Sequence, residues 1–520
     1  MSLFRLLPRR PSRRSTPSSY NQPGQSLYSQ LDSKIIKSDN KKITQQLSTF
    51  SFLPLDVIDE IITKDIVKAK SLRYTSIFRP DLSAQIVERT KKVFAILGLL
   101  EEEDIIKNLF DEGLVDEDLP LTRLQAQGRS NSNVLASRQG KEFKSFSKLG
   151  KERAVDNFLK EQWLVLAPIF TTDGKHFQVD GEAPLPFYDI EKIPTHSISN
   201  VYKALLHPAH LIAIKDYNKK EEFEREKENL IATQNLKHPH LIRHIATIQH
   251  GELYYVIFPW ADGGNLSDFW KSDPDALQTR PPSLFKWSFQ QMFGLVDGLF
   301  ALHEVNCRHG DLKPENILHF RAPDNSTLQH IQSGTLVIAD VGVSRVHQQA
   351  TELRKDPTKT KATTPCYEAP EVELDEKAPR GRRYDMWSVG CIFMEFTIWL
   401  LYGHAAIGNF RKLRSGAAYY EMTTKNTAVI HPAVSRGLEA LRNDPRCGED
   451  TGLSNLVSLI ADDLIVIDAG KRVKAGELKE KFGKIVKTAE EDPEYLVRQT
   501  EPPPRIPDAF TLERNGDGNE

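Results

Sequence analysis

The ten residues His309-Gly310-Asp311-Leu312-Lys313-Pro314-Glu315-Asn316-Ile317-Leu318 constrain this chain more than any other stretch. They place a carboxylate, an amine and a side-chain amide within six residues, directly before an apolar pair typical of a buried strand. Phosphoryl transfer needs a carboxylate to orient a hydroxyl, a cation to offset charge on the phosphate, and an amide oxygen to bind Mg²⁺. The spacing of Asp311, Lys313 and Asn316 therefore predicts a phosphoryl-transfer site.

The same stretch resembles the catalytic loop of the eukaryotic protein kinase superfamily. The alternative, a polar turn ahead of a strand, leaves the ten-residue match unexplained. The resemblance implies that Asp311 orients or deprotonates the substrate hydroxyl and that Lys313 offsets charge on the γ-phosphate. It also implies that Asn316 holds a metal ion.

Further motifs of the large lobe follow in the order that the family has them. Residues 335–342 form a buried-type strand ending in Asp340-Val341-Gly342, similar to Asp-Phe-Gly, so Asp340 is expected to hold Mg²⁺. Residues 364–371 resemble the segment that closes the activation loop, which implies that Thr364 lies near Asp311. The resemblance further implies that Asp385 supports the catalytic-loop backbone and that Arg472 pairs with Glu371.

The small lobe matches the family's nucleotide-binding motifs less completely than the large lobe matches its catalytic motifs. Leu211-Ile212-Ala213-Ile214-Lys215 is similar to the strand whose lysine pairs with the α and β phosphates. In the charged helix that follows, Glu226 is the expected partner of Lys215, with Glu228 as the alternate. Val201 and Ala213 are expected to cover the adenine. Phe258 would be the gatekeeper, and the Pro259 carbonyl and Ala261 amide would bind the adenine edge.

The phosphate-binding loop departs from the family. Counting back from Val201, the three glycine positions hold Pro194, His196 and Ser199. Proline lacks an amide donor, and a forced positive φ at a non-glycine residue costs about 1–2 kcal/mol.

Gly310 stands where many kinases have an arginine that binds activation-loop phosphate. We therefore expect less control through phosphorylation of the loop threonines Thr351, Thr358, Thr360 and Thr363, and more through the N-terminal region.

Composition places the chain in a broad class. A net charge of -2 over 520 residues gives no field for nucleic-acid binding. Four cysteines without metal-like spacing predict free thiols and a reducing, intracellular compartment, cytoplasmic or nuclear. The longest apolar run, residues 391–401, contains Glu395 and is shorter than the roughly 20 residues that span a bilayer. It predicts a buried helix and no membrane span.

The region before residue 185 divides into three predicted parts. Residues 1–43 are arginine-rich and free of acidic residues before Asp32, which favours a disordered basic tail, with a mitochondrial transit peptide as the alternative. Residues 44–120 show helical periodicity near 57–62, from 83 to 100, and from 101 to a stop at Gly113. This helical module is expected to bind a protein partner or to regulate. Residues 121–184 are expected to form a linker and a packing segment.

These observations together predict an α+β, bilobal protein kinase-like fold over residues 185–487, with a C-terminal tail over 488–520. Lys313 and Thr364 favour a serine/threonine protein kinase that uses ATP and Mg²⁺ and acts on a protein substrate. The order of parts resembles that of kinase-like proteins from filamentous fungi. Two rival hypotheses are a pseudokinase scaffold, suggested by the missing glycines and Val341, and a functional helical module with the kinase fold as its sensor.

Overall fold

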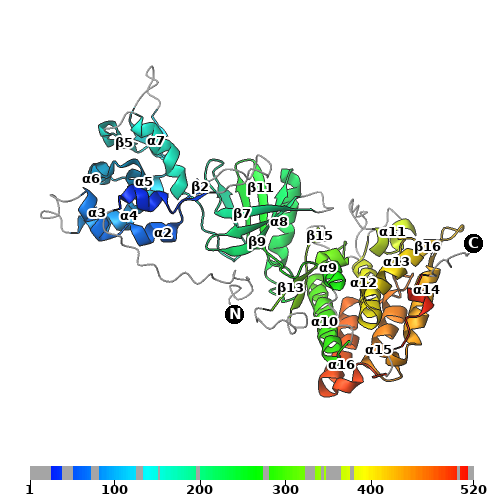
Figure 1. The fold of residues 1–520 in the computed structure, drawn as a ribbon. Helices are drawn as coiled ribbons and strands as arrows, with labels where there is room; N and C mark the ends of the chain where they lie inside the picture. The colour runs from blue at the N-terminus through cyan, green and yellow to red at the C-terminus, as the bar shows by residue number, and fades with distance from the viewer. Residues whose placement is uncertain are drawn as a thin grey trace, which may run out of the picture. The chain divides into compact units, whose positions relative to one another are not determined.

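The computed structural model of the chain describes residues 25–37, 51–71, 81–124, 133–149, 153–194, 200–272, 280–322, 334–340, 345–346, 365–374, 380–500 and 504–512. Figure 1 labels the helices and strands of the chain. The chain forms two compact units. The first unit comprises residues 1–220 and 244–260, and the second comprises residues 221–243 and 261–520. The predicted N-terminal tail falls largely outside the described residues, as do His196, Ser199, Val341, Gly342, Thr364 and the four loop threonines. Most of the predicted C-terminal tail is described, and that prediction is corrected there, because Leu496, Val497 and Phe510 are buried.

The first unit begins with a helical module built around one apolar core. Its helices are α1 (Leu27–Asp32), α2 (Leu55–Ile61), α3 (Lys64–Ser71), α4 (Leu82–Arg89), α5 (Lys91–Leu100), α6 (Ile106–Asp111) and α7 (Ala154–Glu161). Short 3-10 turns are η2 (Glu103–Ile105), η3 (Asp116–Asp118), η4 (Ser145–Lys148) and η5 (Gln162–Val165). Two small sheets join β1 (Ile36–Lys37) to β2 (Ser51–Phe52), and β3 (Thr122–Arg123) to β4 (Leu135–Ala136) and β5 (Glu142–Phe143).

The module extends beyond the predicted range of 44–120 on both sides. Leu27 and Leu31 of α1, which lie in the predicted disordered tail, are buried in its core. Gly98 on α5 makes room for them, since a Cβ there would lie 2.7 Å from Leu27 Cδ2. Phe143, Phe146, Val155, Phe158 and Val165, which lie in the predicted linker and packing segment, complete the same core. The predicted extent of the tail and of the linker is therefore corrected at these residues.

The helix predictions within the module hold in part. A helix follows Pro54, and Gly113 ends α6 with a φ of 79°, as the sequence indicates. The single periodic run predicted from residue 83 is two helices, α4 and α5. Thr90 separates them because its Oγ1 donates to the Ile86 carbonyl at 3.0 Å and its φ is -136°.

The rest of the first unit is a six-stranded sheet. Its order is β6 (Lys175–Val179), β10 (Ala246–His250), β11 (Leu253–Pro259), β9 (His210–Tyr217), β8 (Val201–Leu206) and β7 (Phe187–Ile193). All neighbours are antiparallel except β6 and β10, which run parallel. The buried residues of β9 alternate with half-buried ones, so one sheet face packs into a core that includes Tyr202 of β8 and Ile212 and Ile214 of β9.

Strand β6 comes from the predicted packing segment and is an integral part of this sheet. Phe170, just before it, is 9% exposed and lies in the sheet core. Its ring contacts Phe177 of β6 edge-on at a centroid distance of 4.9 Å and stacks on Phe187 of β7 at 5.8 Å. The segment before residue 185 therefore contributes to the core of the small lobe.

We expect Phe170→Ala to lower the free energy of unfolding by about 3 kcal/mol, because it opens a cavity beneath the sheet. Ile169→Ala is the matched control, since Ile169 is 64% exposed and should change stability by less than about 0.5 kcal/mol. Chemical denaturation measures both. Equal effects of the two substitutions would show that the segment does not belong to the sheet core.

The helical module contacts the sheet through a few side chains. His207, in the β8–β9 turn, meets Asp56 of α2 with its Nε2 2.9 Å from the carboxylate, and its ring lies edge-on to Phe52 at 6.1 Å. Arg138 pairs with Asp180, and Trp163 packs against the sheet core. The module and the sheet therefore share side-chain contacts within one unit.

The second unit is mainly helical. Its longer helices are α8 (Lys220–Gln234, from residue 221 on), α10 (Pro282–Glu304), α12 (Arg383–Tyr402), α13 (His404–Leu413), α14 (Pro432–Arg442) and α16 (Ala475–Glu491). Shorter ones are α9 (Leu266–Lys271), α11 (Glu371–Leu374), α15 (Gly452–Ser458), the π-helical turn η12 (Leu459–Leu464), and the 3-10 turns η7 (Pro314–Asn316), η10 (Pro365–Tyr367), η11 (Pro445–Cys447), η13 (Pro493–Tyr495) and η14 (Asp508–Phe510). Three two-stranded sheets pair β12 (Cys307–Arg308) with β15 (Arg345–Val346), β13 (Ile317–Phe320) with β14 (Thr335–Ile338), and β16 (Tyr420–Met422) with β17 (Ala428–Ile430).

Helix α12 is the centre of this unit, because every residue from Tyr384 to Leu401 is buried. This confirms the buried helix predicted from the apolar run. Within the described residues, no helix has the length and apolar character needed to cross a membrane. All four cysteines are free, as predicted.

Candidate active site

The catalytic loop runs between β12 and β13, and the Asp385 side chain of α12 hydrogen-bonds to its backbone. The Asp385 carboxylate accepts the backbone N–H of His309 at 2.9 Å and that of Gly310 at 2.8 Å, and His303 Nε2 lies 2.8 Å from it. Burial alone would raise the pKa of Asp385, but the hydrogen bond and charge of His303 hold it below its usual value. The predicted support of the loop by Asp385 is therefore confirmed.

His309 ties the loop to the end of strand β14. Its Nε2 donates to the Ala339 carbonyl at 2.8 Å, and its Nδ1 accepts the Asp311 N–H at 3.3 Å. The Ala339 N–H donates to the Asn316 carbonyl at 2.8 Å. These bonds fix the backbone just before Asp340 beside the catalytic loop.

Three of the predicted site residues meet directly in this loop. Lys313 Nζ lies 3.0 Å from Asp311 Oδ2. Asn316 Nδ2 donates to the Asp311 carbonyl at 2.7 Å and to its carboxylate at 3.1 Å. Asp311 and Asn316 are each 8% exposed, so the loop holds its carboxylate and amide in a largely desolvated position. The sequence spacing has placed these groups together, as predicted.

Asp340 follows Ala339 in a left-handed conformation, with a φ of 58°. Such a backbone is unfavourable for a non-glycine residue and persists only where the surroundings enforce it. Here the bonds of Ala339 to His309 and Asn316 fix the preceding residue. The strained residue is thus the one that the sequence assigns to metal binding.

Gly310 also has a left-handed backbone, with a φ of 83°. A Cβ at this position would lie 3.3 Å from Arg308 Nε. Arg308 is 2% exposed, donates to the Arg380 carbonyl at 2.8 Å and lies over the Tyr384 ring at 5.4 Å. A guanidinium group therefore lies beside position 310 even though the residue there is glycine.

Arg472 and Glu371 form the buried ion pair that the sequence predicts. Arg472 is fully buried, and its two terminal nitrogens donate to the two carboxylate oxygens at 2.9 and 3.1 Å. Arg472 also donates to the carbonyls of Val466 and Arg383. The pair joins α11, which begins at Glu371, to the segment that precedes α16.

In the first unit, strand register gathers the predicted nucleotide-binding residues on one sheet face. Lys215 of β9 is paired with Val201 of β8 and with Val256 of β11. Two residues away on the same face, Ala213 is paired with Phe258. These positions face away from the apolar core formed by Ile212 and Ile214. Pro259, the last residue of β11, is buried.

The remaining predicted binding residues belong to the second unit. Glu226 of α8 is 4% exposed, whereas the alternate, Glu228, is exposed. Ala261 is 8% exposed and its carbonyl accepts the Gly264 N–H at 3.2 Å.

His319 of β13 is a buried titratable group close to the catalytic loop. It lies against Gly263 and Gly334, where a Cβ would come within 2.3 and 2.0 Å of its ring. Burial lowers the pKa of His319 to about 4. Its imidazole is therefore neutral in the folded protein down to that pH.

We expect the free energy of unfolding to fall by about 1.4 kcal/mol per pH unit through His319 as the pH drops from 6.5 toward 4, because only the unfolded state takes up the proton. The contribution is complete above pH 6.5. His319→Gln should remove this part of the slope in denaturation curves recorded at several pH values. Parallel curves for the variant and the natural protein would contradict it.

Sequence reasoning missed several residues of this region. His303 binds Asp385, yet as a single histidine in an apolar helix it carries no motif. Many kinases have an arginine at the position of Gly310, but the arginine of this chain, Arg308, lies two residues earlier. Glu395 interrupts an apolar run in the sequence, but it is fully buried and paired with Arg411 and Arg414. Their partners are distant in sequence, so no local pattern indicates them.

The comparison with protein families agrees with this geometry. A family model described as the protein kinase domain matches residues 187–481, more than half of the chain. The chain belongs to the protein kinase family, and membership implies use of ATP and a divalent metal ion. The fold is the α+β, bilobal kinase fold preceded by helices, as predicted.

Curated relatives include named protein kinases. A calcium/calmodulin-dependent protein kinase from Metarhizium anisopliae is 31% identical over 196 residues, which is 36% of this chain and 44% of that protein. A calcium/calmodulin-dependent protein kinase type 1 from Macrobrachium nipponense is 30% identical over 188 residues, 36% of this chain and 48% of that protein. A serine/threonine-protein kinase H1 homolog from Danio rerio is 23% identical over 248 residues, 48% of this chain and 49% of that protein. The chain thus spans less than half the length of these relatives.

Proposed function

We propose that this protein transfers the γ-phosphoryl group of ATP to serine or threonine hydroxyls of a protein substrate. The observation that carries the proposal is the catalytic loop, in which Lys313 and Asn316 both contact the Asp311 carboxylate. Asp311 orients the substrate hydroxyl and accepts its proton as the oxygen–phosphorus bond forms and the bond to the leaving ADP breaks. Lys313 offsets the charge that develops on the phosphoryl oxygens.

The donor set of the loop fits Mg²⁺. Asn316 uses its amide N–H groups on Asp311, which leaves Oδ1 as the acceptor that can face a metal ion. Asp340 supplies a carboxylate from the backbone held beside Asn316. Mg²⁺ bound with phosphates needs only one or two protein carboxylates, with phosphate and water oxygens as further ligands. When bound, it supplies positive charge across the β and γ phosphates.

The nucleotide-binding roles follow the family resemblance. Lys215 binds the α and β phosphates, and Val201 and Ala213 pack against the adenine ring. The Pro259 carbonyl and the Ala261 amide bind the adenine edge, and Glu226 is the proposed partner of Lys215. The shared sheet face of Val201, Ala213 and Lys215 supports the first two assignments.

The test is phosphate transfer from γ-labelled ATP with Mg²⁺ to a generic basic protein, followed by phosphoamino-acid analysis. We expect label on serine and threonine that depends on both ATP and Mg²⁺. Absence of label, or label on tyrosine alone, would overturn the proposal.

Pro194 favours a second candidate, a pseudokinase that binds nucleotide without transferring phosphate. It occupies the first glycine position of the phosphate-binding loop and has no N–H to donate. A thermal melt separates the two functions, because a ligand that binds only the native state raises the melting temperature. A rise with Mg-ATP but no transfer would establish the pseudokinase, whereas a rise with transfer would establish the kinase.

We also propose that the helical module regulates the kinase or binds a protein partner. Within the described residues, it contains no group of three His, Cys, Asp or Glu side chains suited to a metal, and its core is apolar. The kinase fold as a sensor for the module is the alternative. Deletions that test these roles must end after Val165, since an end at residue 127 would divide the module's core.

A further inference from the structure

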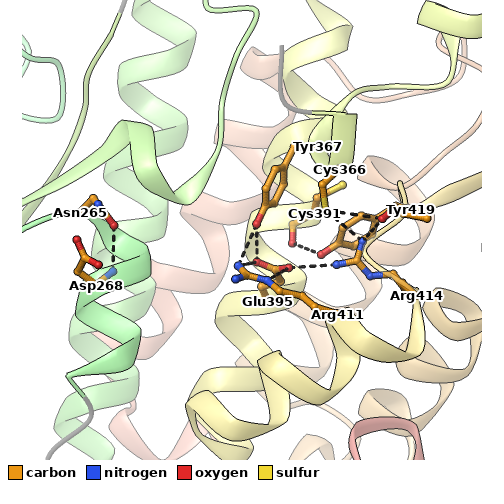
Figure 2. A network of polar contacts seen from close by, with 10 residues as sticks. Asn265, Asp268, Cys366, Tyr367, Cys391, Glu395, Arg411, Arg414 and Tyr419 are labelled. Atoms are coloured by element: carbon orange, nitrogen blue, oxygen red, sulfur yellow. Dashed lines mark hydrogen bonds and ion pairs between the residues drawn. The ribbon is translucent and has the colours of Figure 1, made fainter. Parts of the chain in front are cut away.

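A buried charge cluster lies where the segment closing the activation loop meets α12 and α13 (Figure 2). Glu395 of α12 is fully buried, and its carboxylate pairs with Arg411 at 2.7 Å and with Arg414 at 3.3 Å. Tyr367 of η10 donates to the same carboxylate at 2.9 Å. The cluster therefore links the activation segment to the helical core of the second unit.

The described part of this cluster carries more positive than negative charge. Two guanidinium groups face one carboxylate, and no other carboxylate in the described residues forms an ion pair with either arginine. Arg414 is fully buried, and within the same residues its Nε has no hydrogen-bond acceptor. Burial alone would lower the pKa of Arg414, but the neighbouring Tyr419, Cys366 and Glu395 raise it. Arg414 therefore stays charged, with one positive charge in surplus.

Aromatic rings offset part of this surplus. The Arg414 guanidinium lies 4.0 Å from the centroid of the Tyr419 ring and 4.7 Å from that of Phe410. Such contacts stabilise a cation by about 2 kcal/mol or more when desolvated, less than a paired anion in the same place. The site is thus suited to a further negative charge beside Arg414.

The thiol of Cys366 lies beside the Arg414 guanidinium. Arg414 Nη1 donates to its sulfur at 3.5 Å, and the thiol lies 3.7 Å from the Ala417 carbonyl (Figure 2). Cys366 is partly exposed, whereas Cys307, Cys391 and Cys447 are buried. A cation beside a partly exposed cysteine is the environment typical of reactive cysteines.

We propose that Cys366 is a redox-modification site that small hydroperoxides oxidise to a sulfenic acid. The sulfur attacks one peroxide oxygen, so an S–O bond forms as the O–O bond breaks. The sulfur loses two electrons, and the second oxygen leaves with a proton as water or an alcohol. Arg414 is the positioning residue, because its guanidinium donates to the sulfur at 3.5 Å and its positive charge can stabilise the oxygen that the sulfur gains.

The modification would act on the activation segment. Cys366 is adjacent to Tyr367, whose carbonyl accepts the Ser388 hydroxyl at 2.9 Å and whose side chain binds Glu395. An added oxygen changes the contacts of Cys366 with Arg414 and Ala417 and so shifts this anchored segment. Resting on the proposed kinase function, oxidation is therefore expected to lower protein phosphorylation reversibly.

The test treats the full-length protein with hydrogen peroxide, traps sulfenic acid with dimedone at pH 7 and locates the label by peptide mapping. We expect the label on Cys366, its loss in Cys366→Ser, and labelling at least tenfold faster than in an unfolded peptide of residues 360–372. In Arg414→Gln the rate should fall to that of the peptide. First labelling of one of the buried cysteines, or an equal rate in the peptide, would overturn the proposal; the peptide comparison decides even where Arg414→Gln does not fold.

Activity is read in the same samples. Peroxide should lower phosphate transfer at least fivefold in the natural protein and not in Cys366→Ser, and a thiol reductant should restore it. Fast labelling of Cys366 in a protein that never transfers phosphate would overturn the proposed function and leave the redox site standing. Active protein that resists labelling would overturn the redox site alone.

Discussion

Asp311→Asn is expected to lower the rate of phosphoryl transfer by a factor of about 10³, because it removes the only carboxylate that the catalytic loop places for the substrate hydroxyl. The amide keeps the size of the side chain and retains an oxygen that can accept the Asn316 N–H, so the loop should keep its shape. The melting-temperature rise with Mg-ATP should therefore persist. Steady-state kinetics measures the rate and a thermal melt measures the binding.

Asp462→Asn is the control for this variant. Asp462 is 64% exposed and forms a surface ion pair with Arg442. The substitution should leave the transfer rate within twofold of the natural value. If Asp311→Asn retained more than a tenth of the natural rate, Asp311 would not have the role assigned to it.

Glu395→Gln is expected to lower the free energy of unfolding by about 3–5 kcal/mol, because it leaves the fully buried Arg414 and the partly exposed Arg411 without a paired anion. Arg414 and Glu395 are both fully buried, and Arg411 is only partly exposed. The isosteric amide keeps the packing, so the loss reports on charge and not on cavity formation. Urea denaturation followed by tryptophan fluorescence measures it.

The same Asp462→Asn variant serves as the reference here. An exposed ion pair typically contributes about 0–1 kcal/mol, so its loss should be small. A Glu395→Gln variant no less stable than Asp462→Asn would mean that Glu395 does not neutralise the buried arginines.

The sequence predicts the catalytic loop of the large lobe well because its functional residues are close together in the sequence. Asp311, Lys313 and Asn316 lie within six residues, and the structure joins them by contacts across those few residues. Asp385 and Arg472 are distant from their partners, yet each lies in a recognisable segment. Their contacts with the catalytic loop and with Glu371 could therefore be predicted from family resemblance.

The sequence does not predict contacts whose partners carry no motif. Glu395 meets Arg411 and Arg414 sixteen and nineteen residues later, and nothing in the pattern of α13 marks those arginines. Helix α1 has only six residues, and its burial depends on the space left by Gly98. Strand β6 is recognisable only once β10 is present to pair with it. Thr90 divides a periodic run because its hydroxyl competes for a helix carbonyl.

The most direct test of the central claim is a single-turnover experiment with the protein in excess over γ-labelled ATP, with Mg²⁺ and a protein substrate. We predict that most of the label moves to serine or threonine in one exponential phase with the natural protein. With Asp311→Asn, transfer should be slower by about 10³ while ATP remains bound. Equal transfer by both proteins, or none by the natural protein, would contradict the account.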